Sequence, residues 1–344
     1  MNRFLTAAVL VVFHMVSNGQ TKGFSFVERK EKNQVDVLFN GKLMTAYCYY
    51  DSSRKPILFP VNTVDGITVT RGYPYQIVPG ERTDHPHHTG IWMNYESVNG
   101  LDFWNNSTAI AVEKRNQYGT IRHTAVTDKE ATGNKASLTA TAKWVRPDNK
   151  ILLNEQTTYL FSVQKNDFII DRITTLTATD STVLFKDVKD GMFAIRVARE
   201  LELPSKEKSS FIDDKGNVTT VPPSGADVTG MYYSSEGFKG DSVWSTQGRW
   251  VMLTGRKDGK NITIGMFDHP ENVGYPAYWH ARGYGLFSVN PLGRKIFSNG
   301  KEELNFSLKP KESVTFRYRI VVHSGSALTT DDMNRYASEF GRRL

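Results

Sequence analysis

Hydrophobic and polar residues alternate along much of the chain. In Lys135–Val145, four apolar residues fall on one side of an extended backbone: Leu138, Ala140, Ala142 and Trp144. The segment Val314–Ile320 (VTFRYRI) alternates in the same way. A period of two residues is typical of strands that bury one face and expose the other. Both segments are therefore predicted to be strands of a sheet with one buried side.

Further strands and turns follow this pattern. Three segments are rich in β-branched and aromatic residues, namely Thr158–Val163, Phe168–Thr179 and Asn261–Phe267. Turn-forming pairs separate the apolar runs: Gly133-Asn134, Asp148-Asn149, Asp258-Gly259 and Asn299-Gly300. Many strands joined by short turns predict an all-β fold, a large antiparallel β-sandwich.

The best helical pattern lies near the C-terminus, in Thr330–Arg342. Thr330 is expected to cap this helix, and Asp331 and Asp332 suit the positive end of the helix dipole. Its apolar residues lie on one face, which consists of Met333, Tyr336, Ala337 and Phe340. We therefore predict a short terminal helix that packs on the sandwich.

The composition is that of a globular protein. Of the 344 residues, 23% are charged and 39% hydrophobic, and aromatic residues make up 12%. We predict one β-sandwich domain over residues 21–344. The segment Pro204–Ser235 is its least regular part, and two interpretations stay open: a long loop over a site, or a disordered excursion.

The first twenty residues have the three-part layout of a secretory signal. Asn2-Arg3 is a short positive start, Phe4–Val16 is a mostly apolar run, and cleavage is expected after Gly19 or Gln20. Residues 1–20 are therefore predicted to be a signal peptide, and the protein to be exported to the periplasm or beyond. The single cysteine, Cys48, cannot form an internal disulfide.

Charge and hydropathy exclude two classes of partner. The net charge is +7, but lysines and arginines are scattered and no nucleic-acid-binding motif is present. After the N-terminal run, nothing is long and apolar enough to cross a bilayer. We expect neither nucleic-acid binding nor a membrane span.

Three histidines fall within four positions of the stretch Glu81–Asn106: His85, His87 and His88. On an extended backbone, His85 and His87 would point to one side and His88 to the other. Pro86 cannot donate to a β-ladder, so the segment is predicted at a sheet edge or in a loop, where side chains can reach a pocket.

The histidine segment has three interpretations. It could be a metal site in which His85 and His87 chelate a divalent ion, with a further ligand from Asp84, His269 or His280. It could be an acid/base site, because imidazole titrates near neutral pH and a nearby carboxylate would fix its tautomer. It could also be a histidine-rich turn held by hydrogen bonds.

Two other segments add polar groups. Phe185–Arg196 (FKDVKDGMFAIR) carries charged residues about a predicted turn at Gly191: Lys186, Lys189, Asp190 and Arg196. Phe267–Asn290 contains His280 and the tripeptide Asp268-His269-Pro270, which repeats Asp84-His85-Pro86. Burying so many polar groups is costly unless they have a function, so both segments are candidates for the same site.

Five motifs resemble a known family. They are ERTDHPHHTGIW (Glu81–Trp92) with NGLDFW (Asn99–Trp104), KDG (Lys189–Gly191) with Arg196, FDHP (Phe267–Pro270) with YWH (Tyr278–His280), YGLF (Tyr284–Phe287) with Asn290-Pro291, and the ending Leu308–Gly325. Together they resemble the bacterial PmoA-like family, catalogued as "methane oxygenase PmoA". Two departures are Thr89, where a basic residue is expected, and Asp190, where glutamate is more usual.

The resemblance implies a galactose-mutarotase-like β-supersandwich with histidines, arginines and acidic residues in a sugar-binding cleft. It also implies carbohydrate chemistry outside the cytoplasm. It does not imply a membrane methane monooxygenase, since such a subunit needs several membrane-spanning helices. We therefore expect an exported carbohydrate-active enzyme that uses histidine acid/base chemistry, with lyase, epimerase and glycoside-cleaving reactions all open.

The expected roles can be assigned to individual residues. His88 and His280 would transfer protons, with His85 and His87 in the same site. Substrate oxygens or a developing oxyanion would be bound by the cations Arg82, Lys189 and Arg196. Asp268 and His269 would form the opposite wall, and the stacking rings would be Trp92, Trp104 and Trp279.

No cofactor is expected, and the partner is an oligosaccharide or a glycoside. Two alternatives remain. One is a non-catalytic glycan-binding protein on the same fold, because a fold does not determine a function. The other is a metal-dependent sugar enzyme with His85 and His87 as ligands.

Overall fold

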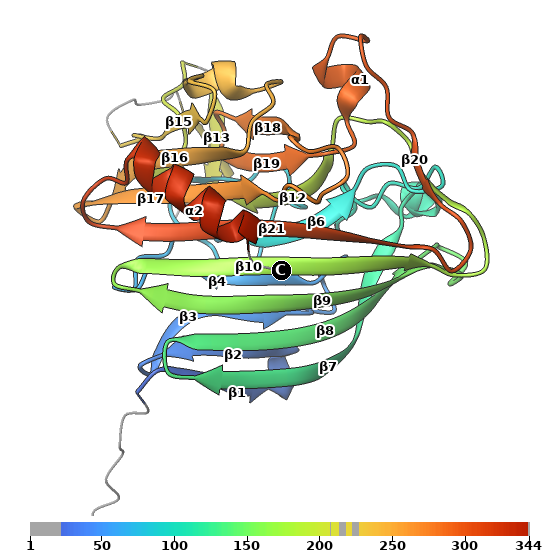
Figure 1. Ribbon diagram of the computed structural model, residues 1–344, viewed down its shortest axis with the longest axis horizontal. Helices are drawn as coiled ribbons and strands as arrows, with labels where there is room; N and C mark the ends of the chain where they lie inside the picture. The colour runs from blue at the N-terminus through green and yellow to red at the C-terminus, as the bar shows by residue number, and fades with distance from the viewer. Residues whose placement is uncertain (1–21, 207, 213–217, 222–226, 343–344) are drawn as a thin grey trace, which may run out of the picture.

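A computed structural model of the chain contains two large antiparallel sheets packed face to face (Figure 1). The structure describes residues 22–206, 208–212, 218–221 and 227–342. The first sheet consists, in spatial order, of β1 (Phe24–Arg29), β2 (Gln34–Phe39), β3 (Lys42–Cys48), β4 (Ile57–Val61), β6 (Ile91–Tyr95), β12 (Gly191–Arg196), β19 (Leu286–Asn290) and β18 (Tyr278–Arg282). The second consists of β15 (Met231–Ser234), β16 (Trp250–Lys257), β17 (Lys260–Asp268), β21 (Ser313–Ser324), β10 (Asp167–Ala178), β9 (Ile151–Gln164), β8 (Lys135–Val145) and β7 (Thr120–Thr132).

The remaining elements are short. Two small sheets pair β11 (Val183–Phe185) with β20 (Phe306–Leu308), and β14 (Val218–Val221) with β13 (Ser209–Ile212) and β5 (Glu81–Arg82). The α-helices are α1 (Arg294–Phe297) and α2 (Thr330–Arg342). The 3₁₀-helices are η1 (Lys30–Lys32), η2 (Val112–Gln117), η3 (Arg199–Leu201) and η4 (Gly240–Val243).

Tight turns set the register of the sheets. Asp258 and Gly259 connect β16 to β17 with φ angles of 49° and 75°, and Asn40 and Gly41 connect β2 to β3 with 50° and 76°. Two successive residues with positive φ are what a type I′ hairpin turn requires. The Asp-Gly and Asn-Gly pairs therefore favour the antiparallel pairing that follows them.

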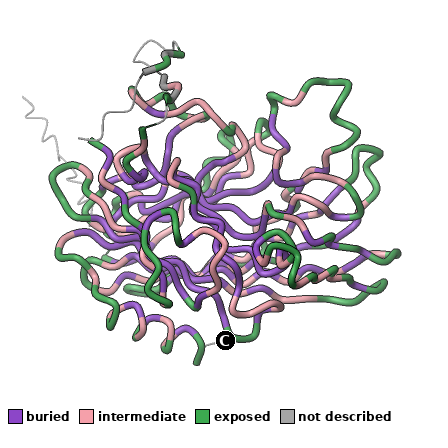
Figure 2. Tube along the Cα trace, turned by 90° about the horizontal axis from the view of Figure 1, so that it is seen from above, coloured by how far each residue is buried: buried purple, intermediate pink, exposed green. Residues whose placement is uncertain are grey.

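The core lies between the two sheets and comes from the alternation of the strands. Phe193 and Ile195 of β12 are fully buried there, with Trp144 of β8 and Tyr318 of β21 from the other sheet. Buried segments fill the middle of the molecule, and exposed segments lie at its rim (Figure 2). The predicted all-β sandwich is confirmed, and β8 has the bounds expected from the sequence.

Helix α2 covers the outer face of the second sheet, across β16, β17 and β21 (Figure 1). Met333, Tyr336 and Phe340 are buried against that face, which confirms the predicted amphipathic helix. The expected cap is wrong by one residue. The Thr329 hydroxyl accepts from the Asp332 amide, and the Asp332 carboxylate accepts from the Thr329 amide, as in a capping box.

The irregular segment Pro204–Ser235 contains more structure than the sequence suggested. Strands β13 and β14 form a hairpin, and β13 also pairs with β5, which directly precedes the histidine segment. The sequence missed these strands because they are short and because β5, which pairs with β13, is far away along the chain. The hairpin thus lies beside the segment that carries the three histidines.

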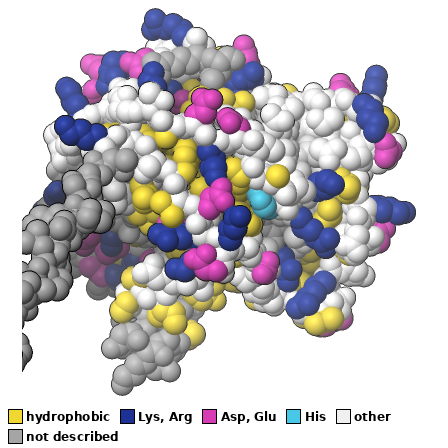
Figure 3. Space-filling view, turned by 90° about the horizontal axis from the view of Figure 1, so that it is seen from below, with side chains coloured by type: hydrophobic (Ala, Val, Ile, Leu, Met, Phe, Trp, Pro, Cys, Tyr) yellow, Lys and Arg dark blue, Asp and Glu magenta, His cyan; other side chains and the backbone are white. Residues whose placement is uncertain are grey.

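No helix in the described ranges is long and apolar enough to cross a membrane. On the face seen in Figure 3, acidic and basic side chains are interspersed and form no continuous basic surface. The expected signal peptide, residues 1–20, lies outside the described residues.

Candidate active site

The histidine segment lies on the face of the first sheet that points away from the core. In the row Trp92, Ala194, Ser288 and His280, each residue is paired directly with the next across β6, β12, β19 and β18. Directly paired residues point to the same side of a sheet. Because Trp92 and Ala194 pack together outside the main core, His280 also points to this outer face.

The three neighbouring histidines form a turn rather than an extended strand. The His88 amide donates to the His85 carbonyl at 2.9 Å, and His85 has a φ of 42°. The expected alternation of their side chains is therefore wrong. Instead the three rings cluster, with centroids 5.6 Å apart for His85 and His87 and 4.3 Å apart for His87 and His88. A left-handed conformation at a non-glycine residue costs roughly 1–3 kcal/mol and is often found at functional sites.

The buried side chain of Arg71 stabilises this turn. Its guanidinium donates to the carbonyls of Asp84, His85 and His88 at 2.7, 2.8 and 2.9 Å. Only 1% of the Arg71 residue is exposed. Three carbonyls pointing at one buried cation fix the backbone of the turn, and with it the directions of the histidine side chains.

The Asp84 carboxylate orients His85. One carboxylate oxygen accepts from Arg71 and from Arg196, each at 2.8 Å, and the other lies 2.9 Å from His85 Nδ1. Burial raises the pKa of Asp84, but the hydrogen bond with His85 and the two guanidinium charges outweigh it and bring this pKa well below its usual value. A carboxylate that is ionised near neutral pH lies at Nδ1, so Nε2 of His85 is directed away from it, and the His85 side chain is 40% exposed. This is the arrangement of an oriented general base or acid.

A stack of four rings connects this pair to the sheet. Tyr284 stacks on His85, with centroids 5.0 Å apart and planes within 2°. His85 stacks on His88 at 4.7 Å, and His88 on Trp92 at 5.3 Å. His88 lies inside the stack and is 2% exposed.

His88 has a fixed tautomer. Its Nδ1 lies 3.2 Å from Nη1 of Arg196, and arginine can only donate, so Nδ1 must be an acceptor. Burial lowers the pKa of His88 well below its usual value, and the neighbouring His87 and Arg196 charges add to this effect. His88 is therefore a neutral ring that carries its proton on Nε2.

A second group of titratable side chains comes from the segments Phe185–Arg196 and Phe267–Asn290. Nδ1 of His280 lies 3.5 Å from the Asp190 carboxylate, which is 3.6 Å from the Lys189 ammonium. Burial raises the pKa of Asp190, and burial lowers that of His280 to about 3, with a contribution from Lys189. His280 thus contacts Asp190 and lies on the same outer sheet face as Trp92, on which His88 stacks. Gly191, however, begins strand β12 rather than forming the predicted turn.

Several residues expected to contact a substrate are inaccessible. Trp92, Trp104 and Trp279 are 0%, 1% and 0% exposed, so they cannot stack on a sugar in this structure. Trp279 points into the main core, while Trp92 and Trp104 pack against the His88 ring. Arg196 is also fully buried and acts on Asp84 and His88 instead of on a ligand.

Asp268 and His269 lie elsewhere, contrary to expectation. Asp268 is the last residue of strand β17 in the second sheet and His269 follows it, and the His269 ring packs against Phe340 of helix α2 at 4.9 Å. That helix covers the outer face of the opposite sheet. The two residues therefore form no wall of the site around His85.

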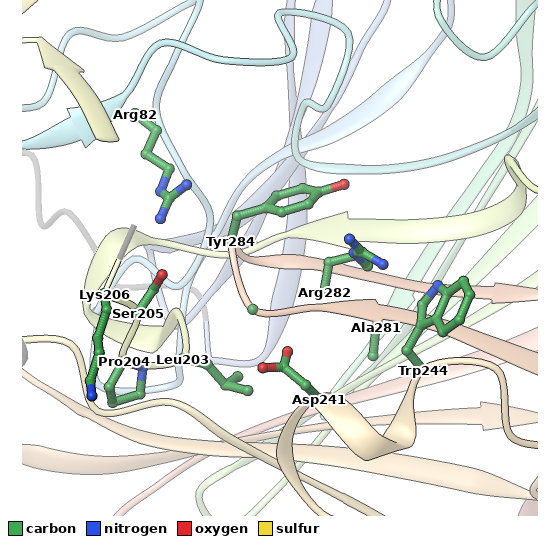
Figure 4. Close-up of a pocket in the computed structure, with 11 residues that line it drawn as sticks. Arg82, Leu203, Pro204, Ser205, Lys206, Asp241, Trp244, Ala281, Arg282 and Tyr284 are labelled. Atoms are coloured by element: carbon green, nitrogen blue, oxygen red, sulfur yellow. The ribbon is translucent and has the colours of Figure 1, made fainter. Parts of the chain in front are cut away.

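The remaining predicted cations flank the site. Lys189 is about half exposed beside Asp190, and Arg82 forms an ion pair with Glu202 at 2.8 Å. Arg82 also lines a cavity of about 500 Å³ that reaches Tyr284, the outermost ring of the stack (Figure 4). This cavity gives a ligand access to the edge of the site.

The electrostatic surroundings disfavour a cation at the histidines. The Lys55 ammonium donates to the His87 carbonyl at 2.7 Å, and burial lowers the pKa of Lys55 to about 7. Burial, with Lys55, His85 and the arginines Arg71 and Arg196, lowers the pKa of His87 to about 2. The positive charges of Arg71 and Arg196 near the rings also disfavour a divalent ion there. No group of three or more His, Cys, Asp or Glu ligands occurs within the described residues.

Comparisons with known proteins give one family and several distant structures. No sequence match was found among curated proteins. The solved structures to which this chain is similar include a GH36 α-galactosidase from Geobacillus stearothermophilus, with 12% identity, a TM-score of 0.39 and coverage of 88% of this chain. This chain spans only 41% of the length of that α-galactosidase.

Two smaller proteins are covered almost completely. A galactose mutarotase related enzyme from Lactobacillus acidophilus has 9% identity and a TM-score of 0.32, with 88% of this chain and 98% of that chain covered. A putative aldose 1-epimerase from Escherichia coli K12 has 8% identity and a TM-score of 0.32, with 88% and 99% covered. A family model matches residues 34–338, and the chain therefore belongs to the family described as "Family of unknown function (DUF6807)".

Proposed function

We propose that this protein is an exported carbohydrate-active enzyme in which His85 transfers the proton. The observation that carries the proposal is the Asp84–His85 pair. A carboxylate held by two buried guanidinium groups orients the most exposed ring of the cluster. Such an assembly fixes the tautomer and direction of an imidazole, which general acid/base catalysis requires and simple adhesion does not.

The other groups have supporting roles. Asp190 has a raised pKa because it is buried, so it is suited to hold and donate a proton, and Lys189 beside it would stabilise a developing oxyanion. His280 contacts Asp190 and would position it. His88, proposed from the sequence as a proton-transfer group, is better suited to hold His85 in place by stacking.

Lyase, epimerase and glycoside-cleaving reactions all use such a pair of proton-transfer groups. A lyase, or an epimerase that inverts a carbon next to a carbonyl, removes a proton from a sugar carbon, whereas glycoside cleavage protonates the leaving oxygen and epimerisation at the anomeric carbon moves protons between oxygens. The apolar run Phe4–Val16 supports export, and the PmoA-like motifs support a role in carbohydrate metabolism. The three reactions differ in whether a carbon-bound hydrogen exchanges with solvent.

The test uses the full mature chain and a panel of plant and host oligosaccharides in D₂O. NMR detects both new products and deuterium incorporated at ring carbons. Turnover that falls at least about 100-fold in His85→Gln would support the proposal. The matched control is His123→Gln, since His123 is half-buried and bonded to Tyr47 outside the site. Turnover that survives in His85→Gln would overturn the proposed role of His85.

A second candidate function is a glycan-binding protein without catalysis. The observation in its favour is that the cavity of about 500 Å³ lies beside the ring stack and includes Tyr284 and Trp244. Oligosaccharide binding without turnover, and with an unchanged affinity in His85→Gln, would favour this candidate. Calorimetric titration of both variants separates the two functions.

A further inference from the structure

The cavity beside the ring stack has walls from four separate parts of the chain (Figure 4). Its polar and aromatic lining residues are Arg82, Ser205, Lys206, Asp241, Trp244, Arg282 and Tyr284. Its volume of about 500 Å³ lies within the range of small-molecule sites. The cavity is therefore large enough for part of an oligosaccharide.

Arg282 is a cation held by aromatic rings. Its guanidinium carbon lies 5.5 Å from the Trp244 ring centroid and 6.0 Å from that of Tyr284. In the described part of the chain, no carboxylate lies within ion-pair distance of Arg282. An exposed guanidinium that is oriented by rings, and not neutralised by an acid, is prepared to bind an anion.

Arg82 contributes a second guanidinium from the other side of Tyr284 (Figure 4). Its Nε donates to Glu202 at 2.8 Å, and no protein partner from the described ranges binds its two terminal nitrogens. Glu202 is 4% exposed and cannot itself reach a ligand in the cavity. The ion pair thus fixes the direction of Arg82 while its terminal nitrogens stay available.

The lining also contains one carboxylate. Asp241 points into the cavity and has no ion-pair partner among the residues described (Figure 4). With Arg82, Lys206 and Arg282 as cations, the formal charge of the lining is +2, from three positive charges and one negative. A carboxylate accepts hydrogen bonds from sugar hydroxyls, while the guanidinium groups bind oxyanions.

We propose that this cavity binds an anionic sugar unit, with a carboxylate or a sulfate group at Arg282 and Arg82 and its hydroxyls at Asp241. This inference rests on the proposed function and gives it a substrate class. Tyr284 connects the two regions, because its ring stacks on His85 and its residue lines the cavity. The acidic unit would therefore sit next to the unit on which His85 acts.

The first experiment compares ligands that differ only in charge. The full chain is titrated calorimetrically with a uronic-acid oligosaccharide, its carboxyl-reduced neutral form, and the neutral form carrying a sulfate. The acidic forms should bind about tenfold more tightly or better, because hydrogen bonds to charged groups are stronger. This preference should weaken as salt is added, since the cavity is open to solvent. The two acidic arms distinguish a carboxylate from a sulfate.

The second experiment changes the charge of the cavity in both directions. Arg282→Gln should reduce the preference for the acidic form about tenfold, and Arg282→Lys should restore part of it. Asp241→Asn should increase the same preference, because it removes the negative charge from the lining. A misfolded protein would not gain a preference for the acidic ligand. An increased preference in Asp241→Asn therefore tests the proposal even if Arg282→Gln fails to fold. The control is Lys150→Gln, since the Lys150 side chain is 77% exposed on a distant turn.

The outcomes separate this inference from the proposed function. If neutral and acidic ligands bind with equal affinity and turnover still requires His85, the proposed anionic site is wrong. The proposed enzymatic function would remain supported by that result. If the preference for the acidic ligand is unchanged in both Arg282→Gln and Asp241→Asn, the proposed anionic site is also wrong. If no saccharide of any charge binds, the proposed function fails together with this inference.

Discussion

Two parts of this molecule contain the same tripeptide and differ in almost everything else. Asp84-His85-Pro86 lies on the outer face of the first sheet, and Asp268-His269-Pro270 lies at the end of strand β17 in the second, where His269 packs against helix α2. The Asp84 carboxylate accepts from Arg71 and Arg196, and the His85 side chain is 40% exposed. The first tripeptide is therefore charged, oriented and accessible.

The second tripeptide is enclosed. Asp268 accepts from the Asn272 side chain at 2.7 Å and the Ala277 amide at 2.9 Å, and it is 4% exposed. Burial raises its pKa to about 7, and these hydrogen bonds only partly oppose the increase. His269 is 2% exposed and packs on Phe340. Asp268 fixes a turn after β17 that lies away from the site around His85.

The difference comes from residues that are distant in sequence. Arg71 and Arg196 bring two guanidinium groups to the first carboxylate, while the second has only neutral donors. An identical local sequence thus acquires opposite electrostatics from its tertiary neighbours.

The largest expected effect is on turnover. Asp84→Asn should reduce turnover about 10²- to 10⁴-fold, because the amide no longer stabilises a protonated His85 and favours the wrong tautomer. Asp268→Asn should leave turnover within about twofold. Steady-state rates on the best saccharide of the screen measure both. Equal losses in the two variants would mean that the tripeptides do not differ in function.

The next largest effect is on stability at the first tripeptide. Arg71→Met removes a buried cation that holds three carbonyls and the Asp84 carboxylate, and it should cost about 3–5 kcal/mol of unfolding free energy. Urea denaturation monitored by fluorescence gives this value. Arg146→Met is the control, because Arg146 is 45% exposed and its pair with Asp148 should contribute at most about 1 kcal/mol. A similar small loss in both variants would contradict the anchoring role of Arg71.

The sequence predicted the sandwich well because the pattern that encodes it is local. Alternation in Lys135–Val145 depends only on which face of one strand is buried, and strand β8 has these bounds. The apolar face of Thr330–Arg342 likewise determined that α2 packs on a sheet. The clustering of the histidines near position 85 also came from the local sequence.

The electrostatics of the site could not be predicted in the same way. Tryptophans near the histidines suggested sugar stacking, but Trp92 and Trp104 lie on the buried side of the ring stack. The repeated tripeptide suggested a shared cleft, but chain topology places Asp268 on the opposite sheet. Arg71 was missed, although it continues the alternating phase of Ile67 and Val69, where an apolar residue is expected. The sequence signal that could have revealed this role was a charged residue at a position where the alternation places a buried apolar side chain.

The two carboxylates should also give opposite dependences of stability on pH. The pKa of Asp268 is raised from 3.8 to about 7 by burial, so the unfolded chain releases this proton first. Its effect is to lower stability as the pH rises from about 4 to about 7, by up to about 4 kcal/mol. The pKa of Asp84 is lowered, so the stability it contributes is present above about pH 4 and lost as the pH falls further.

Substitution tests each slope. Asp268→Asn should remove the decline between about pH 4 and pH 7, whereas Asp84→Asn should leave that decline in place. Urea denaturation at several pH values measures both slopes. A decline that persists in Asp268→Asn would show that another group causes it.

The smallest effect concerns the helix that encloses the second tripeptide. Thr329→Ala removes the hydroxyl that caps α2, which should cost about 1 kcal/mol. Because Phe340 of this helix covers His269, hydrogen exchange should increase at the backbone amides of α2 and near His269 and stay unchanged near His85. Thr330→Ala is the matched control, since Thr330 is exposed and the capping bonds involve Thr329. Faster exchange at both tripeptides in Thr329→Ala would mean that the two regions open together. The tripeptides would then differ in their electrostatics but not in their local stability.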